Sequence, residues 1–477
     1  MRTKTNWILA YILVFISLFA GSETILAKSN NSKPNIVFIL ADDLGWGDLS
    51  CLGQKNFQTP HLDKLASDGL LMTNFHTGST VCAPSRAALM TGRHTGHNTV
   101  RSNKGGYVLR DDEITIAEIL KKQGYATGCI GKWGVGSPKD MNDPERNGID
   151  YFYGYVGMGH AHNLFPEFLY RNGEKVFLNN KLRLNEDGSN PWLDKSEGMG
   201  VSEIRNDYAP FLFDKEALQF IERNKNNPFF LYLAYNTPHA NNEDPVTGCE
   251  VPDYGEFKDK DWPDVEKGFA KMVTNLDNSV GMVEKKLKEL GLDENTIVFF
   301  CSDNGPHQEG GHEMEYFNSN GDLLGMKRDL YEGGIRTPLI VKWKGVIKPN
   351  TKDHHLSAFW DVLPTFCDIA GANYPKEIDG VSFLPTITGK GKQKKHDFLY
   401  WEFYPRGGLQ ALIQDNWKAI RFNLNNGKER EIKLYNLKDD PEEKIDVSNE
   451  HRELVKKFEL LFEKARDDNY GIKLFTK

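Results

Sequence analysis

The sequence is poor in cysteine, in net positive charge and in long hydrophobic runs. Six cysteines are scattered over 477 residues without a C-x-x-C pair or a zinc-like spacing, so no disulfide framework is indicated. Lys and Arg number 59 against 67 Asp and Glu, which gives a formal net charge of −8. This balance disfavours a nucleic-acid binder, which normally carries a basic excess. The 39% of hydrophobic residues is ample for a packed core.

The one long apolar run lies at the N-terminus. Residues 7–20 read WILAYILVFISLFA, after the positive charges of Arg2 and Lys4 and before small residues as far as Ala27. A membrane-spanning helix needs about 20 residues, so this run is short for one. The pattern is typical of a secretory signal peptide over residues 1–27, with an uncleaved anchor as the alternative. We therefore expect an exported protein, periplasmic or secreted, with no stable membrane span after signal cleavage.

Residues 28–390 are predicted to form a large α/β domain. Short apolar runs that suit buried strands alternate with helix-like segments, which predicts a mostly parallel central sheet flanked by helices. The predicted strands are residues 35–41, 126–130, 228–235, 296–301 and 338–343. The predicted helices are residues 59–68, 84–91, 115–123, 214–224, 265–290 and 357–370. The stretch 142–206 is loop-rich and aromatic, and we expect it to face the substrate.

Residues 391–477 are predicted to form a smaller C-terminal α+β subdomain. It follows a basic, turn-rich stretch, GKGKQKKHD, that is typical of a linker. An antiparallel sheet is predicted from the runs at 398–403, 409–414, 417–421 and 431–435. Residues 449–467 have the pattern of a charged amphipathic helix.

Polar pairs follow two of the predicted strands. Asp42 and Asp43 end the first strand, and Asp303 with Asn304 follows the strand that ends at Cys301. Ligands of doubly wound sheets bind outside the carboxyl ends of the strands, so these side chains are expected to converge. A set of oxygen donors suits a hard cation such as Ca²⁺ or Mg²⁺. Either pair alone could instead cap a helix or form a turn.

A cysteine stands at the start of a predicted helix in the segment TVCAPSRAAL. Pro84 suits the first helical turn, so Cys82 lies at the N-terminus, where backbone N–H groups favour an anion. Arg86 is four residues on and on the same face, where its guanidinium can clamp an oxyanion. The alternative is a buried cysteine before an ordinary surface helix. The pattern C-x-P-S-R should occur by chance in fewer than about one in a hundred chains of this length.

Seven motifs together cover most of residues 35–370. They are FILADDLGWGD (38–48), TPHLDKLASDG (59–69), CAPSRAALMTGR (82–93), GKW (131–133), NTPH (236–239), CSDNG (301–305) and KRDLYEGGIRTPLIV (327–341). In content and order they resemble the type I sulfatases of the alkaline-phosphatase superfamily. Within that family the chain is similar to arylsulfatases and to bacterial carbohydrate sulfatases that act on N-acetylgalactosamine.

The resemblance implies a sulfuric ester hydrolase with formylglycine at Cys82, which a separate maturation enzyme makes. In that family the hydrated aldehyde supplies the nucleophile, and one hydroxyl attacks sulfur and expels the alcohol. The second hydroxyl then loses its proton, the aldehyde re-forms and sulfate leaves. The unmodified thiol cannot perform this reaction.

The resemblance also implies roles for the residues around Cys82. Arg86 would support the formylglycine, and Lys132 and Lys327 would neutralise the sulfate oxygens. His239 would lie near the bridging oxygen as a general acid. The family's metal, normally Ca²⁺, would act as a Lewis acid. Its matching ligands are Asp42, Asp43, Asp303, Asn304 and the modified Cys82.

One position departs from the family pattern. Many relatives carry His two residues after the Lys, in a G-K-W-H motif, where this chain has Gly134. The usual partner of the second formylglycine hydroxyl is therefore missing. Its role falls to water or to another group, and the candidate side chains are His94, His97, His160 and His162.

The resemblance favours a sulfated glycan as the substrate, with sulfated galactose or N-acetylgalactosamine attacked at a chain end. The loop histidines that could bind sugar hydroxyls are His160, His162, His307 and His312, although each could be an ordinary loop histidine.

Two other functions stay open. One is a phosphoester or phosphonate hydrolase of the same superfamily, although its commoner members use a Ser or Thr nucleophile and His-rich zinc sites. The other is a non-catalytic glycan-binding protein in which Cys82 is never converted. The C-x-P-S-R motif and the oxygen-only ligand set argue against the first, and the nearly complete charge set argues against the second.

Overall fold

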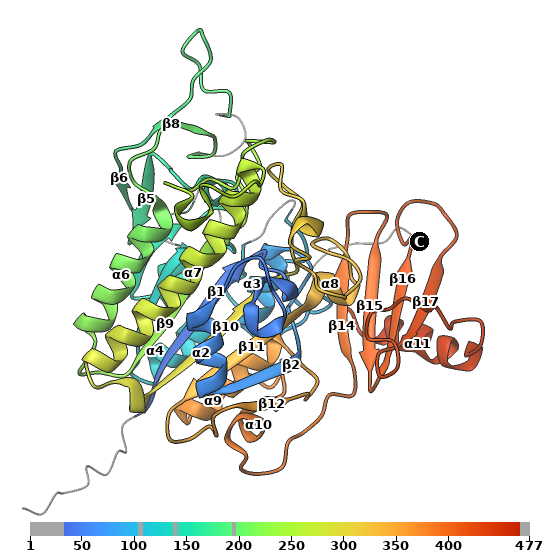
Figure 1. Cartoon of the computed structure of the whole chain (residues 1–477). Helices are drawn as coiled ribbons and strands as arrows, with labels where there is room; N and C mark the ends of the chain where they lie inside the picture. The colour runs from blue at the N-terminus through green and yellow to red at the C-terminus, as the bar shows by residue number, and fades with distance from the viewer. Residues whose placement is uncertain (1–32, 104–107, 137–139, 141–142, 193–196, 468–477) are drawn as a thin grey trace, which may run out of the picture. The chain divides into compact units, whose positions relative to one another are not determined.

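A computed structural model describes residues 33–103, 108–136, 140, 143–192 and 197–467 (Figure 1). The predicted signal peptide lies outside these residues. No helix in the described part is long and apolar enough to cross a bilayer. The contacts define a compact unit that begins at Pro34 and continues past residue 390. The predicted boundary at that residue stays a prediction.

A long mixed sheet forms the centre of this unit. Its strands are β1 (Asn35–Asp42), β2 (Leu70–His76), β3 (Ala126–Lys132), β4 (Tyr151–Tyr155), β5 (Phe168–Arg171), β6 (Glu174–Phe177), β9 (Phe229–Pro238), β10 (Thr296–Ser302), β11 (Arg336–Trp343), β12 (Thr351–Asp353) and β13 (Ser357–Ala358). The order in the described residues is β12-β2-β11-β10-β1-β9-β3-β4-β5-β6, and β13 also pairs with β2. From β10 to β4 all neighbours are parallel, whereas β11 and the β5-β6 hairpin are antiparallel. The predicted, mostly parallel central sheet is confirmed.

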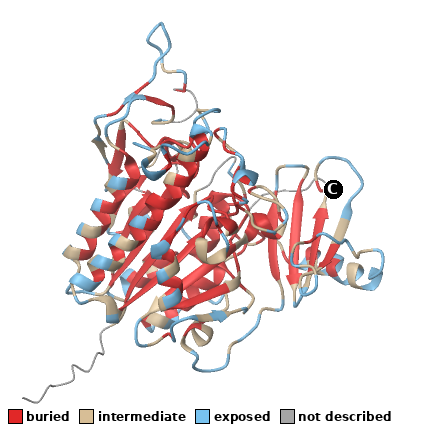
Figure 2. Cartoon of the chain, in the orientation of Figure 1, coloured by how far each residue is buried: buried red, intermediate tan, exposed pale blue. Residues whose placement is uncertain are grey.

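Helices cover both faces of the sheet (Figure 1). They are α2 (Pro60–Asp68), α3 (Cys82–Thr91), α4 (Ile116–Lys122), α5 (Asp143–Arg146), α6 (Ala209–Arg223), α7 (Asp264–Glu289), α8 (Glu332–Ile335), α9 (Val362–Ala370) and α10 (Leu384–Thr388). Successive side chains of a strand point to opposite faces. Ile36, Phe38 and Leu40 of β1 therefore pack into a core with α3, α4 and α9. Val37 and Ile39 pack into a second core with α2, α6 and α7, and Figure 2 shows both cores as buried.

A separate antiparallel sheet lies in the C-terminal region, as predicted. Its strands are β14 (Leu399–Phe403), β15 (Leu409–Gln414), β16 (Trp417–Phe422) and β17 (Glu431–Asn436), in that order. One face packs through Trp401 against Trp360 of the main body. The other face packs against Phe458 and Phe462 of α11 (Arg452–Lys464).

Several segments differ from the sequence-based expectation. Strand β2 was not predicted, and α6 begins at Ala209 rather than at residue 214. The stretch 142–206 is not simply loop, because β4, β5 and β6 extend the main sheet and β7 (Lys181–Leu182) pairs with β8 (Ser202–Ile204). Phe168 and Tyr170 of this stretch belong to the core, whereas Phe177 is exposed. The helix expected at 357–370 begins only at Val362, because Ser357 and Ala358 pair with β2 instead.

Candidate active site

The two polar pairs meet at the carboxyl edge of the sheet. Register between β1 and β10 places Ala41 opposite Ser302, so the residues that follow lie side by side. Asp43 adopts a left-handed backbone conformation with φ 66°, which Asp tolerates better than most residues. Its backbone N–H donates to Asp303 Oδ1 at 3.2 Å. Asp42, Asp43, Asp303 and Asn304 are all fully buried.

Cys82 begins α3 beside these carboxylates. All ten residues of α3 are buried, which excludes the ordinary surface helix. One potential ligand atom each of Asp42, Cys82 and Asp303 lies within 4.8 Å of the others. Burial raises the pKa of the Cys82 thiol, so the thiol is a poor nucleophile unless it is modified.

Arg86 is directed at the same point from α3. Its Nε and one terminal nitrogen donate to Asp303 Oδ2 at 2.9 and 2.8 Å, and the other donates to the carbonyl of Lys132 at 2.6 Å. Burial opposes the charge of Arg86, but the neighbouring carboxylates outweigh it and raise its pKa. The guanidinium is therefore a fixed cation beneath Asp303 and Cys82.

Lys132 and Lys327 approach from two further elements. Lys132 ends β3, and its Nζ lies 2.5 Å from Asp42 Oδ2. Lys327 precedes α8, and its Nζ lies 2.7 Å from Asp43 Oδ2 and 3.0 Å from His239 Nε2. Burial acts to lower the pKa of each lysine, but the carboxylates raise both. Both ammonium groups therefore stay charged inside the protein.

His239 follows β9 and is a neutral imidazole. Its Nδ1 lies 2.6 Å from the carbonyl of Ala240, so Nδ1 carries the proton and Nε2 accepts from Lys327. Burial and the charge of Lys327 lower the pKa of His239 to about 3. The predicted acid thus presents a lone pair, and the nearest proton is on the ammonium group of Lys327.

The carboxylates leave oxygen atoms free to bind a cation. Burial acts to raise the pKa of Asp42 and Asp43, but the nearby lysines hold both below the ordinary value. Burial and the charge of Asp42 raise the pKa of Asp303 to about 7. Asp42 Oδ1 and Asn304 Oδ1 are buried and have no hydrogen-bond partner among the described residues. Such unsatisfied acceptors are costly, and a hard divalent cation fits this all-oxygen donor set.

The structure brings only some of the predicted sugar-binding histidines to this site. The His162 ring stacks on His239 at a centroid distance of 4.9 Å. His307 lies 5.9 Å from His239 and bonds the carbonyl of Pro238. His160 is instead buried among aromatic rings, 4.6 Å from Phe168. His312 stacks on Phe269 and bonds Glu266, behind the site.

Sequence reasoning missed two polar residues at this site. Glu309 accepts from Lys327 at 2.7 Å and also pairs with Arg328. Asn103 donates to Cys82 Sγ at 3.5 Å. Each is a single polar residue in a loop, so neither forms a pattern by itself. Only the proximity of Glu309 to the CSDNG motif at 301–305 could have drawn attention to it.

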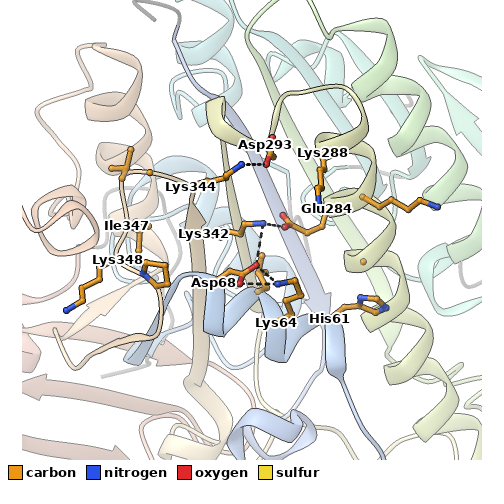
Figure 3. Close-up of a pocket in the computed structure, with 16 residues that line it drawn as sticks. His61, Lys64, Asp68, Glu284, Lys288, Asp293, Lys342, Lys344, Ile347 and Lys348 are labelled. Atoms are coloured by element: carbon orange, nitrogen blue, oxygen red, sulfur yellow. Dashed lines mark hydrogen bonds and ion pairs between the residues drawn. The ribbon is translucent and has the colours of Figure 1, made fainter. Parts of the chain in front are cut away.

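A separate cleft lies elsewhere in the described part of the chain. It measures about 810 Å³ and is bordered by α2, α7 and the end of β11. Trp343 at this end pairs with Ile297 at the start of β10, so the cleft is at the opposite edge of the sheet. In Figure 3, Lys64, Lys342 and Lys344 pair with acids, and Lys344 lies 2.8 Å from Asp293. The cleft therefore contains no part of the cluster around Cys82.

Comparison with known families agrees with this arrangement. The sulfatase family model matches residues 34–372, well over half of the chain. The chain belongs to the sulfatase family. A second model, the C-terminal region of N-sulphoglucosamine sulphohydrolase, matches residues 324–468 of this sulfatase. The predicted activity, sulfuric ester hydrolysis, is therefore confirmed.

Individual relatives cover most of this sulfatase. Arylsulfatase A of Bos taurus is 33% identical over 82% of this chain and 75% of its own length. The N-acetylgalactosamine-6-O-sulfatase of Bacteroides thetaiotaomicron is 30% identical over 95% of this chain and 98% of its own. A crystal structure of Ps i-CgsB with k-i-k-neocarrahexaose superposes with a TM-score of 0.76 and 28% identity, covering 94% of this chain and 95% of that one. The predicted alkaline-phosphatase-like fold is confirmed.

Proposed function

We propose that this sulfatase is an exported enzyme that removes sulfate from glycans, with a formylglycine that a maturation enzyme makes from Cys82. The favoured substrate is a sulfated galactose or N-acetylgalactosamine at a chain end. Supporting this substrate, the bacterial relative named as an N-acetylgalactosamine-6-O-sulfatase matches nearly end to end. The observation that carries the proposed chemistry is the convergence of Cys82, Lys132 and Lys327 on one buried carboxylate cluster.

The unsatisfied carboxylate and amide oxygens support a bound Ca²⁺, with Mg²⁺ as the alternative. When bound, this ion supplies Lewis-acid polarisation of the sulfate and of the side chain at position 82. The residues that would hold it are Asp42, Asp43, Asp303, Asn304 and the converted Cys82.

The chain's own cations would bind the sulfate group. Both lysines are buried, and ion pairs hold Lys132 on Asp42 and Lys327 on Asp43. Their charge is therefore preorganised where negative charge develops. His239 is oriented by Ala240 and lies 3.0 Å from Lys327. His239 would act as the acid for the leaving alcohol whenever its Nε2 carries a proton, and its pKa of about 3 means that this proton is readily given up.

The first test is the mass of the tryptic peptide that carries Cys82, from protein made with a maturation enzyme. Conversion of CH₂SH to CHO lowers the mass by about 18 Da by atom counting. The converted protein should hydrolyse an aryl sulfate faster than an aryl phosphate, and Cys82→Ala should do neither. Faster phosphate hydrolysis would favour the phosphoesterase alternative. Binding of sulfated sugar without turnover by converted protein would favour the non-catalytic one.

The second test is a panel of monosulfated sugars. Galactose and N-acetylgalactosamine sulfates should be turned over with higher kcat/KM than glucosamine sulfates, at chain ends before internal positions. Equal or better turnover of glucosamine sulfates would refute the substrate assignment and leave the sulfatase assignment intact.

A further inference from the structure

Gly134 leaves no room for a side chain. It has φ 79°, a left-handed conformation that non-glycine residues rarely adopt. A Cβ at this position would lie 2.8 Å from Arg86 Cδ. Arg86 therefore occupies the space beside residue 134, and a side chain there would require Arg86 to shift.

Within the described part of the chain, none of the four candidate histidines forms a hydrogen bond with Cys82. His94 and His97 lie 3.4 and 2.8 Å from Asp379, and His94 packs against Trp360 and Tyr400. His160 is enclosed by aromatic rings, and His162 is stacked on His239.

Asn103 contacts Cys82 instead. Its Nδ2 donates to Cys82 Sγ at 3.5 Å, and its Oδ1 accepts the backbone N–H of Ala83 at 3.2 Å. The amide thus bridges the reactive side chain and the first turn of α3. We propose, given the proposed function, that Asn103 takes the place of the missing histidine and positions the converted side chain at residue 82.

Hydrogen bonds of Arg101 fix the loop that carries Asn103. Arg101, two residues earlier, is only 3% exposed. It donates to the carbonyl of Asn98 at 2.7 Å and to Glu402 Oε1 at 3.1 Å. Glu402 belongs to β14 and also accepts from Tyr400 at 2.7 Å. The C-terminal sheet thereby holds Asn103 over Cys82, although the Asn103 side chain itself is exposed.

An amide and an imidazole act differently at this position. Asn donates and accepts hydrogen bonds but does not take up a proton between pH 5 and 9. Asn103 therefore acts by orientation, and any proton lost from residue 82 goes to water or to another group. Orientation should appear in kcat more than in KM, because it favours the reacting geometry rather than substrate binding.

The test uses converted full-length protein with Asn103 changed to Ala, Asp or His. Asn103→Ala should lower kcat about tenfold to a hundredfold, the range expected for a lost hydrogen bond to a reacting group, with KM changed by less than about threefold. Asn103→Asp should lose as much, because a carboxylate would face an anionic substrate. Asn103→His should add an ionisation near the ordinary histidine pKa of about 6.5 to the pH profile of kcat, which a purely structural residue would not do.

Two controls separate this inference from its premises. Asn426→Ala removes an exposed asparagine that likewise donates from Nδ2 and accepts a backbone N–H, and it should leave kcat unchanged. The conversion of Cys82, read by mass, should be equal in all variants. If wild-type protein is converted yet inactive, the proposed function fails.

A readout without activity is the crystal structure of the converted enzyme. Asn103 Nδ2 should lie within about 3.2 Å of an oxygen on residue 82, the usual limit for such a hydrogen bond. A separation beyond about 4 Å, or an unchanged kcat in Asn103→Ala, would overturn the inference.

Discussion

The stability of the protein should fall as the pH rises through the titration of Glu443. Lys418 of β16 is fully buried, and its Nζ lies 2.8 Å from both Glu332 and Glu443. Glu332 also pairs with Arg336 and with His76. Two buried carboxylates thus share one ammonium group, and Glu332 has the better set of partners.

The direction of the pKa shift of Glu443 decides whether the free energy of unfolding rises or falls with pH. Burial, with the charge of Glu332, raises the pKa of Glu443 from 4.5 to about 7, although Lys418 opposes this. Between these values the folded state binds more protons than the unfolded state, so the free energy of unfolding decreases as the pH rises. The difference amounts to about 3 kcal/mol, present below pH 4.5 and lost by about pH 7.

Denaturant titration at pH 5, 6, 7 and 8 measures this effect. Glu443→Gln removes the titration, so the difference between Glu443→Gln and wild type should grow by about 2.5 kcal/mol across this range in favour of the variant. Glu442→Gln is the matched control, because this neighbour pairs with the exposed Lys444. Parallel pH dependence of wild type and Glu443→Gln would refute the reasoning.

Three further results are expected. Lys327→Ala should lower kcat/KM for a sulfate ester by on the order of a hundredfold or more, as loss of a preorganised charge does; a loss below tenfold in steady-state kinetics would contradict its role. His162→Ala should raise KM for a sulfated sugar with little loss of stability, whereas His160→Ala should lower the melting temperature and leave KM unchanged, because His162 stacks on His239 and His160 lies against Phe168. The reverse pattern in paired kinetic and thermal assays would refute this placement. Chelation should remove activity and a bound ion detected by mass spectrometry, and Ca²⁺ should restore activity in wild type but poorly in Asp303→Asn; a chelated enzyme that stays fully active would exclude the proposed ion.

Much of the site was predictable because its residues form patterns in the sequence. Asp42 ends an apolar strand, Asp303 directly follows another, and Cys82 begins a helix with Pro84. The loop residues were not predictable in this way. Glu309 and Asn103 reach the site through long-range hydrogen bonds that no periodicity encodes.

Two of the predicted histidines show that sequence can also assign a site role to a residue that the structure buries elsewhere. His160 and His162 lie two residues apart in one short 3-10 turn, yet one faces an aromatic core and the other faces the site. Both were expected near the substrate because they lie in a loop, but in the structure His160 is buried among aromatic rings and His162 stacks on His239. A polar residue type is thus a weak guide to function unless the packing around it is known.

The charges of the site explain why a cation and a sulfate group suit it together. The charged side chains are Asp42, Asp43, Asp303, Glu309, Arg86, Lys132, Lys327 and Arg328. With Asp303 ionised, the four acids and four bases cancel, and His239 is neutral. The side chains alone therefore offer no net attraction for an anion. A divalent cation on the free oxygens of Asp42 and Asn304 would leave the site with two positive charges, which would balance the two negative charges of the departing sulfate dianion. The lysines would therefore position the sulfate group, and the proposed ion would provide the net charge that binds it.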